Sequence, residues 1–218
     1  PTGALAAPWA RKAYAVECST LSRAWIQALA ARVQKAGARF VDCPVTGIPA
    51  KAALGELTLF VGADRKDITA LRPVFDCLAT QVIHFGPIGA GNAYKLMVNL
   101  MGSVQIAALA EGLVMAERAG LDRRKVVAAL TQGAAASPQV VRNARQMLAG
   151  RHDRDIVFPA LWRHKDAAYG VRLARDLGVA APLGTAAARA FRKVLDAGFA
   201  AQNESKLVDV LGAPASKA

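Results

Sequence analysis

The order of apolar and polar positions changes character once along this chain, near residue 88. Before that point, short apolar runs predict β-strands at residues 12–17, 39–45, 56–62 and 81–86. Between the runs, amphipathic stretches predict helices at residues 19–37 and 64–79. The order of strand, helix, strand, strand, helix and strand is an α/β pattern.

Suitable residues mark the ends of both predicted helices. The first helix can be capped by Ser19, Thr20 or Ser22. Gly37 can end it, because glycine readily adopts the left-handed conformation at a helix C-terminus. Asp64 can cap the second helix, within which Pro73 fits a kink or a short break better than a regular turn.

Beyond Gly91 the strand signals stop, and residues 92–120 predict one long helix. Residues 96–116 are apolar enough to suggest a membrane span. Asn99, Gln105 and Glu111 interrupt that stretch. We therefore interpret the helix as the buried axis of a helical domain, which is apolar on nearly every side.

Shorter helical patterns follow, separated by glycine and proline. They cover residues 121–133, 137–150, 160–178, 182–198 and 203–212. The chain therefore predicts two domains, an α/β domain at residues 1–88 and an all-α domain at residues 89–218.

Composition supports a folded protein with a sizeable core, since 54% of the residues are hydrophobic and 20% are charged. The net charge of +12 raises nucleic acid as a partner. However, the basic residues are mostly dispersed, and clusters such as residues 123–125 are short and lack interleaved aromatics. We interpret them as a solvated surface that can also gather anionic cofactors and acids, and predict no nucleic-acid partner.

The cysteines and histidines predict neither a disulfide framework nor a metal site. The three cysteines, Cys18, Cys43 and Cys77, form no CxxC motif. The three histidines, His84, His152 and His164, form no HxH or HxxxH pair. With no basic head and apolar run at the N-terminus, we expect a cytoplasmic protein without a signal peptide or membrane anchor.

A glycine-rich stretch, GPIGAGNAYKLMVN at residues 86–99, is the first candidate for chemistry. Lys95 and Asn99 are four residues apart, so they share one face of the predicted helix. Gly91 lies one turn earlier, where the missing side chain would let a ligand approach the ammonium group. The glycines match a dinucleotide fingerprint only loosely, because that motif sits at the first strand-to-helix turn. A flexible linker and a helix start with a solvated lysine explain the stretch equally well.

Two further stretches could carry chemistry. In VDCPVTG, a strand runs through Pro44 into Thr46 and Gly47. A threonine hydroxyl and the amides of a glycine turn can bind a small carboxylate, although a plain Pro-Gly turn is the alternative. In FPALWRHKDAA, Lys165 and Asp166 are predicted to open a helix, where a lysine is ordinarily a surface residue.

Together the three stretches resemble the β-hydroxyacid dehydrogenase family. The similarity lies in D-x-P-V-T-G followed by Ala52 and Gly55, in G-x-G-x-x-x-K-x-x-x-N, and in F-x-x-x-x-x-x-K-D. That family includes 3-hydroxyisobutyrate dehydrogenase and the tartronate, succinic and glyoxylate semialdehyde reductases. Residues 95–122 look most like the glyoxylate/succinic semialdehyde reductase branch, and the resemblance extends from about Tyr14 to Leu211.

The resemblance implies an oxidoreductase that uses NADP or NAD to interconvert a short 3-hydroxy acid and its semialdehyde. Its implied catalytic residues are Lys95, the general acid/base, and Asn99, which places the lysine and the substrate. The substrate-binding residues would be Thr46, Gly47, Ile48, Lys95 and Asn99, and the cofactor-binding residues Thr20, Gly91, Phe158 and Lys165. Partial burial of Lys95 would bring its pKa towards the working pH.

The resemblance also implies a fold and partners. The fold would be a partial Rossmann-type sheet domain followed by an all-α domain round a long central helix, similar to the C-terminal domain of 6-phosphogluconate dehydrogenase. We expect the glycines to let Lys95 face a cleft between the domains. The partners would be a small-molecule carboxylate substrate and further copies of the chain. The all-α domain would bind the substrate and join the copies as a dimer.

Two departures from the family pattern bear on activity. Ile48 stands where the family has a second small residue, so the carboxylate-binding loop should be narrower. Nothing before Tyr14 resembles the strand, G-x-G-x-x-G turn and helix with which the family begins. We therefore expect an incomplete nucleotide-binding domain, in a fragment of a longer enzyme or a degenerate relative. The alternative function is a non-catalytic dimerising or ligand-binding remnant.

Overall fold

A computed structural model of the chain describes residues 9–10 and 12–213. These residues form two compact units, one up to Val98 and the other from Asn99 onward. The division falls within helix α4, whereas the sequence places the change of class at residue 88. The expectation about the segment before Tyr14 falls largely on residues 1–8 and 11, which lie outside the described residues.

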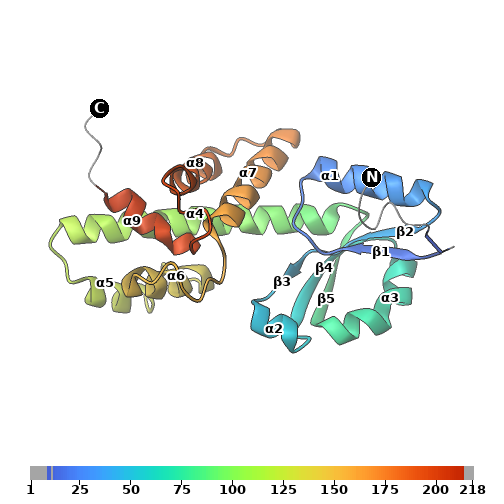
Figure 1. Ribbon diagram of the computed structural model, residues 1–218, viewed down its shortest axis with the longest axis horizontal. Helices are drawn as coiled ribbons and strands as arrows, with labels where there is room; N and C mark the ends of the chain where they lie inside the picture. Colours follow the sequence, from blue (N-terminus) through green and yellow to red (C-terminus); the bar gives the residue numbers. More distant parts are fainter. Residues whose placement is uncertain (1–8, 11, 214–218) are drawn as a thin grey trace. The chain divides into compact units, whose positions relative to one another are not determined.

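The first unit contains a mixed β-sheet (Figure 1). Its strands are β1 (Tyr14–Glu17), β2 (Arg39–Asp42), β3 (Val45–Thr46), β4 (Leu57–Gly62) and β5 (Ala79–Gly86). β1 and β2 run parallel, with Tyr14 opposite Arg39 and Glu17 opposite Asp42. β4 pairs antiparallel with β2 and β3, and parallel with β5. The sheet is thus the mixed α/β arrangement that the sequence predicts.

Helices cover both faces of this sheet (Figure 1). They are α1 (Arg23–Lys35), the short α2 (Pro49–Ala53) and α3 (Arg65–Leu78). Successive strand residues point to opposite faces. On β2, Phe40 therefore packs with the buried side of α1, and its neighbour Val41 packs with Leu71 and Phe75 of α3.

Two details of the first unit differ from the prediction. The single strand expected at residues 39–45 is broken into β2 and β3, because Pro44 has no N–H to donate to a strand ladder. Its carbonyl still accepts a hydrogen bond from the Phe60 amide at 2.9 Å. The connection between β3 and β4, for which a plain Pro-Gly turn was the alternative, contains helix α2, in which Pro49 occupies the first turn, the position that tolerates proline best.

The predicted helix ends are partly as expected. Ser22 is the residue that caps α1, and its hydroxyl accepts a hydrogen bond from the Trp25 amide at 3.3 Å. Asp64 precedes α3 without a capping hydrogen bond from its side chain. Pro73 lies inside α3, which continues through it to Leu78.

The second unit is helical, which confirms the predicted order of an α/β part and an all-α part. Helix α4 (Ala90–Arg118) has 29 residues and runs through the division between the units. The elements after it are α5 (Arg123–Leu130), α6 (Pro138–Ala149), α7 (Ala160–Asp176), α8 (Pro182–Asp196), the 3-10 helix η2 (Glu204–Lys206) and α9 (Leu207–Gly212).

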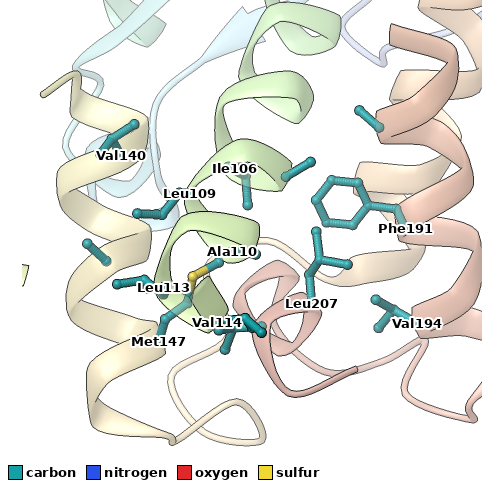
Figure 2. Close-up of a cluster of buried hydrophobic side chains, with 14 of the residues drawn as sticks. Ile106, Leu109, Ala110, Leu113, Val114, Val140, Met147, Phe191, Val194 and Leu207 are labelled. Carbon is teal, nitrogen blue, oxygen red and sulfur yellow. The ribbon is translucent and has the colours of Figure 1, made fainter. Parts of the chain in front are cut away.

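The core of the second unit is built round α4. Ile106, Ala110 and Leu113 of α4 pack with side chains from α6, α8 and α9 (Figure 2). By length and composition alone, α4 could also cross a membrane. Half of its most apolar window is buried, an arrangement common to the core helices of soluble proteins.

Candidate active site

A buried carboxylate holds the glycine-rich start of α4. Asp42, the last residue of β2, is fully buried, and one of its oxygens accepts a hydrogen bond from the Asn92 amide at 2.9 Å. The nearby amides of Gly89 and Gly91 also favour the charged form of this carboxylate. Amides at a helix N-terminus are suited to a negative charge. In this protein the turn that could have cradled a phosphate binds its own aspartate.

Gly91 is needed for close packing within the first unit. A Cβ at this position would lie 2.1 Å from the carbonyl oxygen of Phe60 on β4. A Cβ at Gly62 would lie 2.7 Å from the Asp42 carboxylate and 2.9 Å from the Gly91 nitrogen. The space beside Gly91 is thus filled by strand β4. We expected a glycine here because a ligand needs room, but the glycine is required because the strand packs against it. A contact of Gly91 with the nucleotide stays a prediction.

Asp42 should make the stability of the protein depend on pH. Burial raises its pKa to about 6, and the backbone amides of Asn92, Gly89 and Gly91 oppose the rise. Because the pKa of Asp42 in the folded state lies above its value in the unfolded state, the contribution of Asp42 to the free energy of unfolding is most favourable below about pH 4. This contribution is lost as the pH rises through 6. The loss from a shift of this size is about 3 kcal/mol.

We expect Asp42→Asn to gain stability relative to the wild type as pH rises from 4 to 7, because asparagine accepts the Asn92 hydrogen bond without a buried charge. Denaturant unfolding at several pH values measures the difference in free energy of unfolding. Glu56→Gln, which changes an exposed carboxylate in the same unit, is the matched control. A wild-type-to-variant difference that is constant with pH would contradict the prediction.

The predicted carboxylate-binding loop is exposed in the first unit. Thr46 ends β3, and Gly47 has a φ of 141°, a conformation that favours glycine. Ile48 follows with an extended backbone and a side chain that is 43% exposed. Position 48 therefore does not need a glycine for its conformation. The isoleucine adds bulk to an open turn without straining it.

The loop between β1 and α1 occupies a position at which sheets of this kind bind ligands. It lies beyond the carboxyl ends of the parallel strands β1 and β2, where open α/β sheets bind ligands. Cys18 and Ser19 are exposed there, and Thr20, predicted to approach the cofactor, is half-buried. The Asn92 side-chain amide donates to the Leu21 carbonyl at 2.6 Å and accepts from the Leu21 N–H at 3.1 Å, so the loop is tied to the start of α4.

The predicted catalytic pair lies on α4. Lys95 is half-buried, and Asn99, one turn further on, is buried. The Asn99 side-chain amide donates to the Asp166 carboxylate at 2.7 Å, and its carbonyl accepts from the Arg163 guanidinium at 3.3 Å. Two residues of α7 thus fix Asn99 through both its side chain and its backbone.

Phe158 and Lys165 belong to the second unit. The Phe158 ring lies under the Arg163 guanidinium, 4.5 Å from ring centroid to carbon. The Lys165 ammonium forms an ion pair with Asp166 at 3.1 Å. Helix α7 begins at Ala160, so Lys165 and Asp166 lie in its second turn and do not open it as predicted.

A buried glutamate anchors this arrangement. Glu204 of η2 is fully buried and accepts hydrogen bonds from Arg142 and Arg163, each at 2.5 Å, and from Asn143 at 3.1 Å. Arg163 itself is only 3% exposed. Its charge is therefore compensated inside the protein by Glu204, which accepts from Nε, while Nη1 donates to the Asn99 backbone carbonyl.

Sequence reasoning assigned no role to Asp42, Asp166, Arg163 or Glu204. Two of them had a visible signal, because Asp42 opens the D-x-P-V-T-G motif and Asp166 closes the F-x-x-x-x-x-x-K-D motif. Glu204 had none, because a glutamate among Asn203, Ser205 and Lys206 is typical of an exposed segment. Among the described residues, no group of three or more histidine, cysteine, aspartate or glutamate side chains is placed to hold a metal ion.

Two family models match the sequence. One, described as the NAD binding domain of 6-phosphogluconate dehydrogenase, matches residues 2–86. The other, described as NAD-binding of NADP-dependent 3-hydroxyisobutyrate dehydrogenase, matches residues 89–211, more than half of the chain. The chain belongs to the β-hydroxyacid dehydrogenase family. The matches confirm the predicted family and, since both models describe NAD-binding domains, the prediction of NAD or NADP as cofactor.

Several named relatives align with most of the chain. Glyoxylate/succinic semialdehyde reductase 2 of Arabidopsis thaliana is 26% identical over 93% of this chain and 56% of its own length. An NAD-dependent L-serine dehydrogenase of Pseudomonas aeruginosa is 27% identical over 87% of this chain and 65% of its own length. Probable 3-hydroxyisobutyrate dehydrogenase-like 3 of Arabidopsis thaliana is 36% identical over 77% and 48%. The chain thus spans about half to two thirds of these relatives.

Solved structures of the family share the fold. The 3-hydroxyisobutyrate dehydrogenase of Salmonella typhimurium superposes with a TM-score of 0.82 at 28% identity. The match covers 90% of this chain and 69% of the Salmonella chain. The enzyme of Mycobacterium tuberculosis, solved with L-serine, also has a TM-score of 0.82 at 28% identity, covering 94% and 72%. These similarities confirm the predicted fold class, a Rossmann-type sheet followed by a helical domain.

Proposed function

We propose that this chain acts as an NAD- or NADP-dependent oxidoreductase that interconverts a short 3-hydroxy acid and its semialdehyde. One observation carries the proposal: half-buried Lys95 shares a face of α4 with Asn99, which Asp166 and Arg163 hold in place. A lysine beside a fixed amide is suited to exchange a proton with a bound substrate. The named substrates of the relatives are also small acids that carry an aldehyde or a hydroxyl group.

The chemistry requires one proton at the substrate oxygen. The bound nicotinamide cofactor supplies the hydride for reduction and accepts it in oxidation. Reduction of the aldehyde leaves a negative charge on its oxygen, and the Lys95 ammonium donates a proton there. In oxidation the neutral amine accepts the hydroxyl proton. Asn99 would hold the substrate oxygen within reach of Lys95 through a hydrogen bond.

The exposed turn after β3 would bind the other end of the substrate. The Thr46 hydroxyl and the backbone amides after Gly47 offer hydrogen-bond donors to a carboxylate. Ile48 narrows this turn compared with the small residue of the family pattern, so we propose the shortest acids as preferred substrates. Thr20, Gly91, Phe158 and Lys165 are the residues we propose for the nucleotide.

Steady-state oxidation of NADH and NADPH tests the function. Glyoxylate, succinic semialdehyde and methylmalonate semialdehyde are the substrates, and nucleotide binding is titrated separately by fluorescence. We expect turnover with at least one of them, by this chain or by a longer chain that restores any upstream coding sequence. Nucleotide binding without turnover by either chain would support the non-catalytic alternative.

We also propose a cytoplasmic homo-oligomer with no nucleic-acid or membrane partner. The support for assembly is large apolar side chains exposed on the second unit, among them Met101, Met115, Trp162 and Leu183. Light scattering over a range of concentrations tests it, and we expect a mass of at least two chains. A mass of 22.8 kDa at every concentration would contradict the proposal.

A further inference from the structure

Cys18 and Cys43 lie side by side where the parallel strands β1 and β2 end. Glu17 pairs with Asp42, and the Cys43 amide donates to the Glu17 carbonyl at 2.9 Å, so the strand pairing continues to the two cysteines. Neighbouring strands are about 4.8 Å apart. That spacing falls within the range of about 4.4–6.8 Å between the Cα atoms of disulfide-bonded cysteines.

The two side chains also leave their strands in the same direction. Cys18 follows Val16 by two residues, and Cys43 follows Val41 by two. Val16 and Val41 both belong to the cluster that packs against α3. Because side chains alternate along an extended chain, the two cysteines point to that same face. The two thiols are close enough to influence each other, because an interaction with the other cysteine is the largest cause of the pKa shift of each.

The two thiols differ in access and acidity. Cys18 is exposed, whereas Cys43 is fully buried. The interaction with Cys43 lowers the pKa of Cys18, although burial and the nearby Glu17 carboxylate oppose the shift. The same interaction, together with burial, raises the pKa of Cys43. Cys18 is therefore the thiol that forms a thiolate more readily and meets an oxidant in solution.

We propose that Cys18 and Cys43 form a site of reversible oxidation, at which a small disulfide such as oxidised glutathione converts the two thiols into an intramolecular disulfide. The sequence alone did not indicate this pair, because the residues are far apart and belong to no CxxC motif. The argument for this site does not depend on the proposed dehydrogenase activity, and its test requires no turnover.

The reaction proceeds in two balanced exchanges. The Cys18 thiolate attacks one sulfur of oxidised glutathione, forms a mixed disulfide and releases one glutathione thiolate. The Cys43 sulfur then attacks the Cys18 sulfur, which forms the internal disulfide and releases the second glutathione. The two cysteine protons end on the two glutathione molecules. The oxidant is thus reduced to two thiols while the protein loses two hydrogen atoms.

Burial of Cys43 sets the order of these exchanges. Glutathione cannot reach the fully buried sulfur of Cys43, but this sulfur can attack Cys18 from the buried face of the sheet. The largest cause of the raised pKa of Cys43 is its interaction with Cys18. Formation of the mixed disulfide removes the Cys18 thiolate, so this cause is absent when Cys43 loses its proton, whereas burial still raises the pKa of Cys43.

Intact-mass measurement of the reduced chain after treatment with oxidised glutathione tests the proposal. We expect the loss of two hydrogen atoms, a Cys18–Cys43 linked peptide after digestion, and reversal by dithiothreitol. Cys43→Ser should stop at one glutathione attached to Cys18, and Cys18→Ser should leave Cys43 unmodified. Cys77→Ser is the matched control, since it removes an exposed cysteine on α3 and should leave disulfide formation unchanged.

Three results would overturn the proposal: a wild-type chain that keeps its glutathione adduct at Cys18 without closing the disulfide, a linked peptide that contains Cys77, or no reaction at Cys18. A second measurement needs no variant. Alkylation of the folded wild type with iodoacetamide near neutral pH should modify Cys18 severalfold faster than Cys77 and spare Cys43. Equal rates at all three cysteines would contradict the assignment.

Discussion

Replacing Lys95 by alanine is expected to lower the turnover number by about two to four powers of ten, the usual contribution of a positioned proton donor. Alanine cannot supply a proton to the developing negative charge on the substrate oxygen. Affinity for the nucleotide should change little, because we assign the nucleotide to other residues. The measurement is steady-state oxidation of NADH or NADPH with the best substrate of the wild type, together with a fluorescence titration of the nucleotide.

Three variants sharpen this prediction. Lys95→Arg should not restore turnover, since a guanidinium group holds its proton near neutral pH. Asn99→Ala should have a smaller effect than Lys95→Ala, because the amide orients the reactants and transfers no proton. Lys125→Ala removes an exposed lysine and should turn over like the wild type. Turnover near the wild-type level in Lys95→Ala would remove the lysine from the mechanism.

The arrangement of elements could be predicted because it depends on local patterns. Apolar runs marked the strands, and the long apolar stretch after Gly91 gave α4 its place as the axis of a helical domain. Errors arose where one residue had two possible effects. Pro44 was expected to lie within a strand and instead separates β2 from β3, whereas Pro73 was expected to disturb a helix that continues through it.

The contacts that hold the candidate site could not be predicted, because their partners are distant in the sequence. Asp42 and Asn92 are 50 residues apart, and Asn99 and Asp166 are 67 apart. A single sequence shows that these residues are polar, but not which polar residues meet. The glycines are instructive in the same way. Their density indicated a sharp turn, yet the reason for Gly91 is the carbonyl of Phe60 on a strand.

Removing the charge of Glu204 is expected to destabilise the second unit by about 3–5 kcal/mol, the usual cost of leaving a buried charge without its partner. Glu204 is fully buried between Arg142 and Arg163, and Arg163 is itself almost completely buried. In Glu204→Gln the neutral amide keeps the shape of the side chain but no longer compensates two guanidinium groups. Denaturant unfolding of the wild type and the variant measures the change in free energy.

A surface ion pair in the same unit provides the control. Glu117→Gln breaks a contact of 3.9 Å with Arg123, in which the glutamate side chain is 65% exposed, and should change stability by less than about 1 kcal/mol.

A double-mutant cycle separates lost charge compensation from lost packing. If the cost arises from Arg163, then Glu204→Gln should be markedly less destabilising in an Arg163→Met background than in the wild type. An equal cost in both backgrounds would show that the charge of Arg163 does not require Glu204. Arg163 also donates a hydrogen bond to the Asn99 carbonyl, so Glu204→Gln should hold Asn99 less firmly. We therefore expect a lower turnover number even at temperatures at which the variant remains folded.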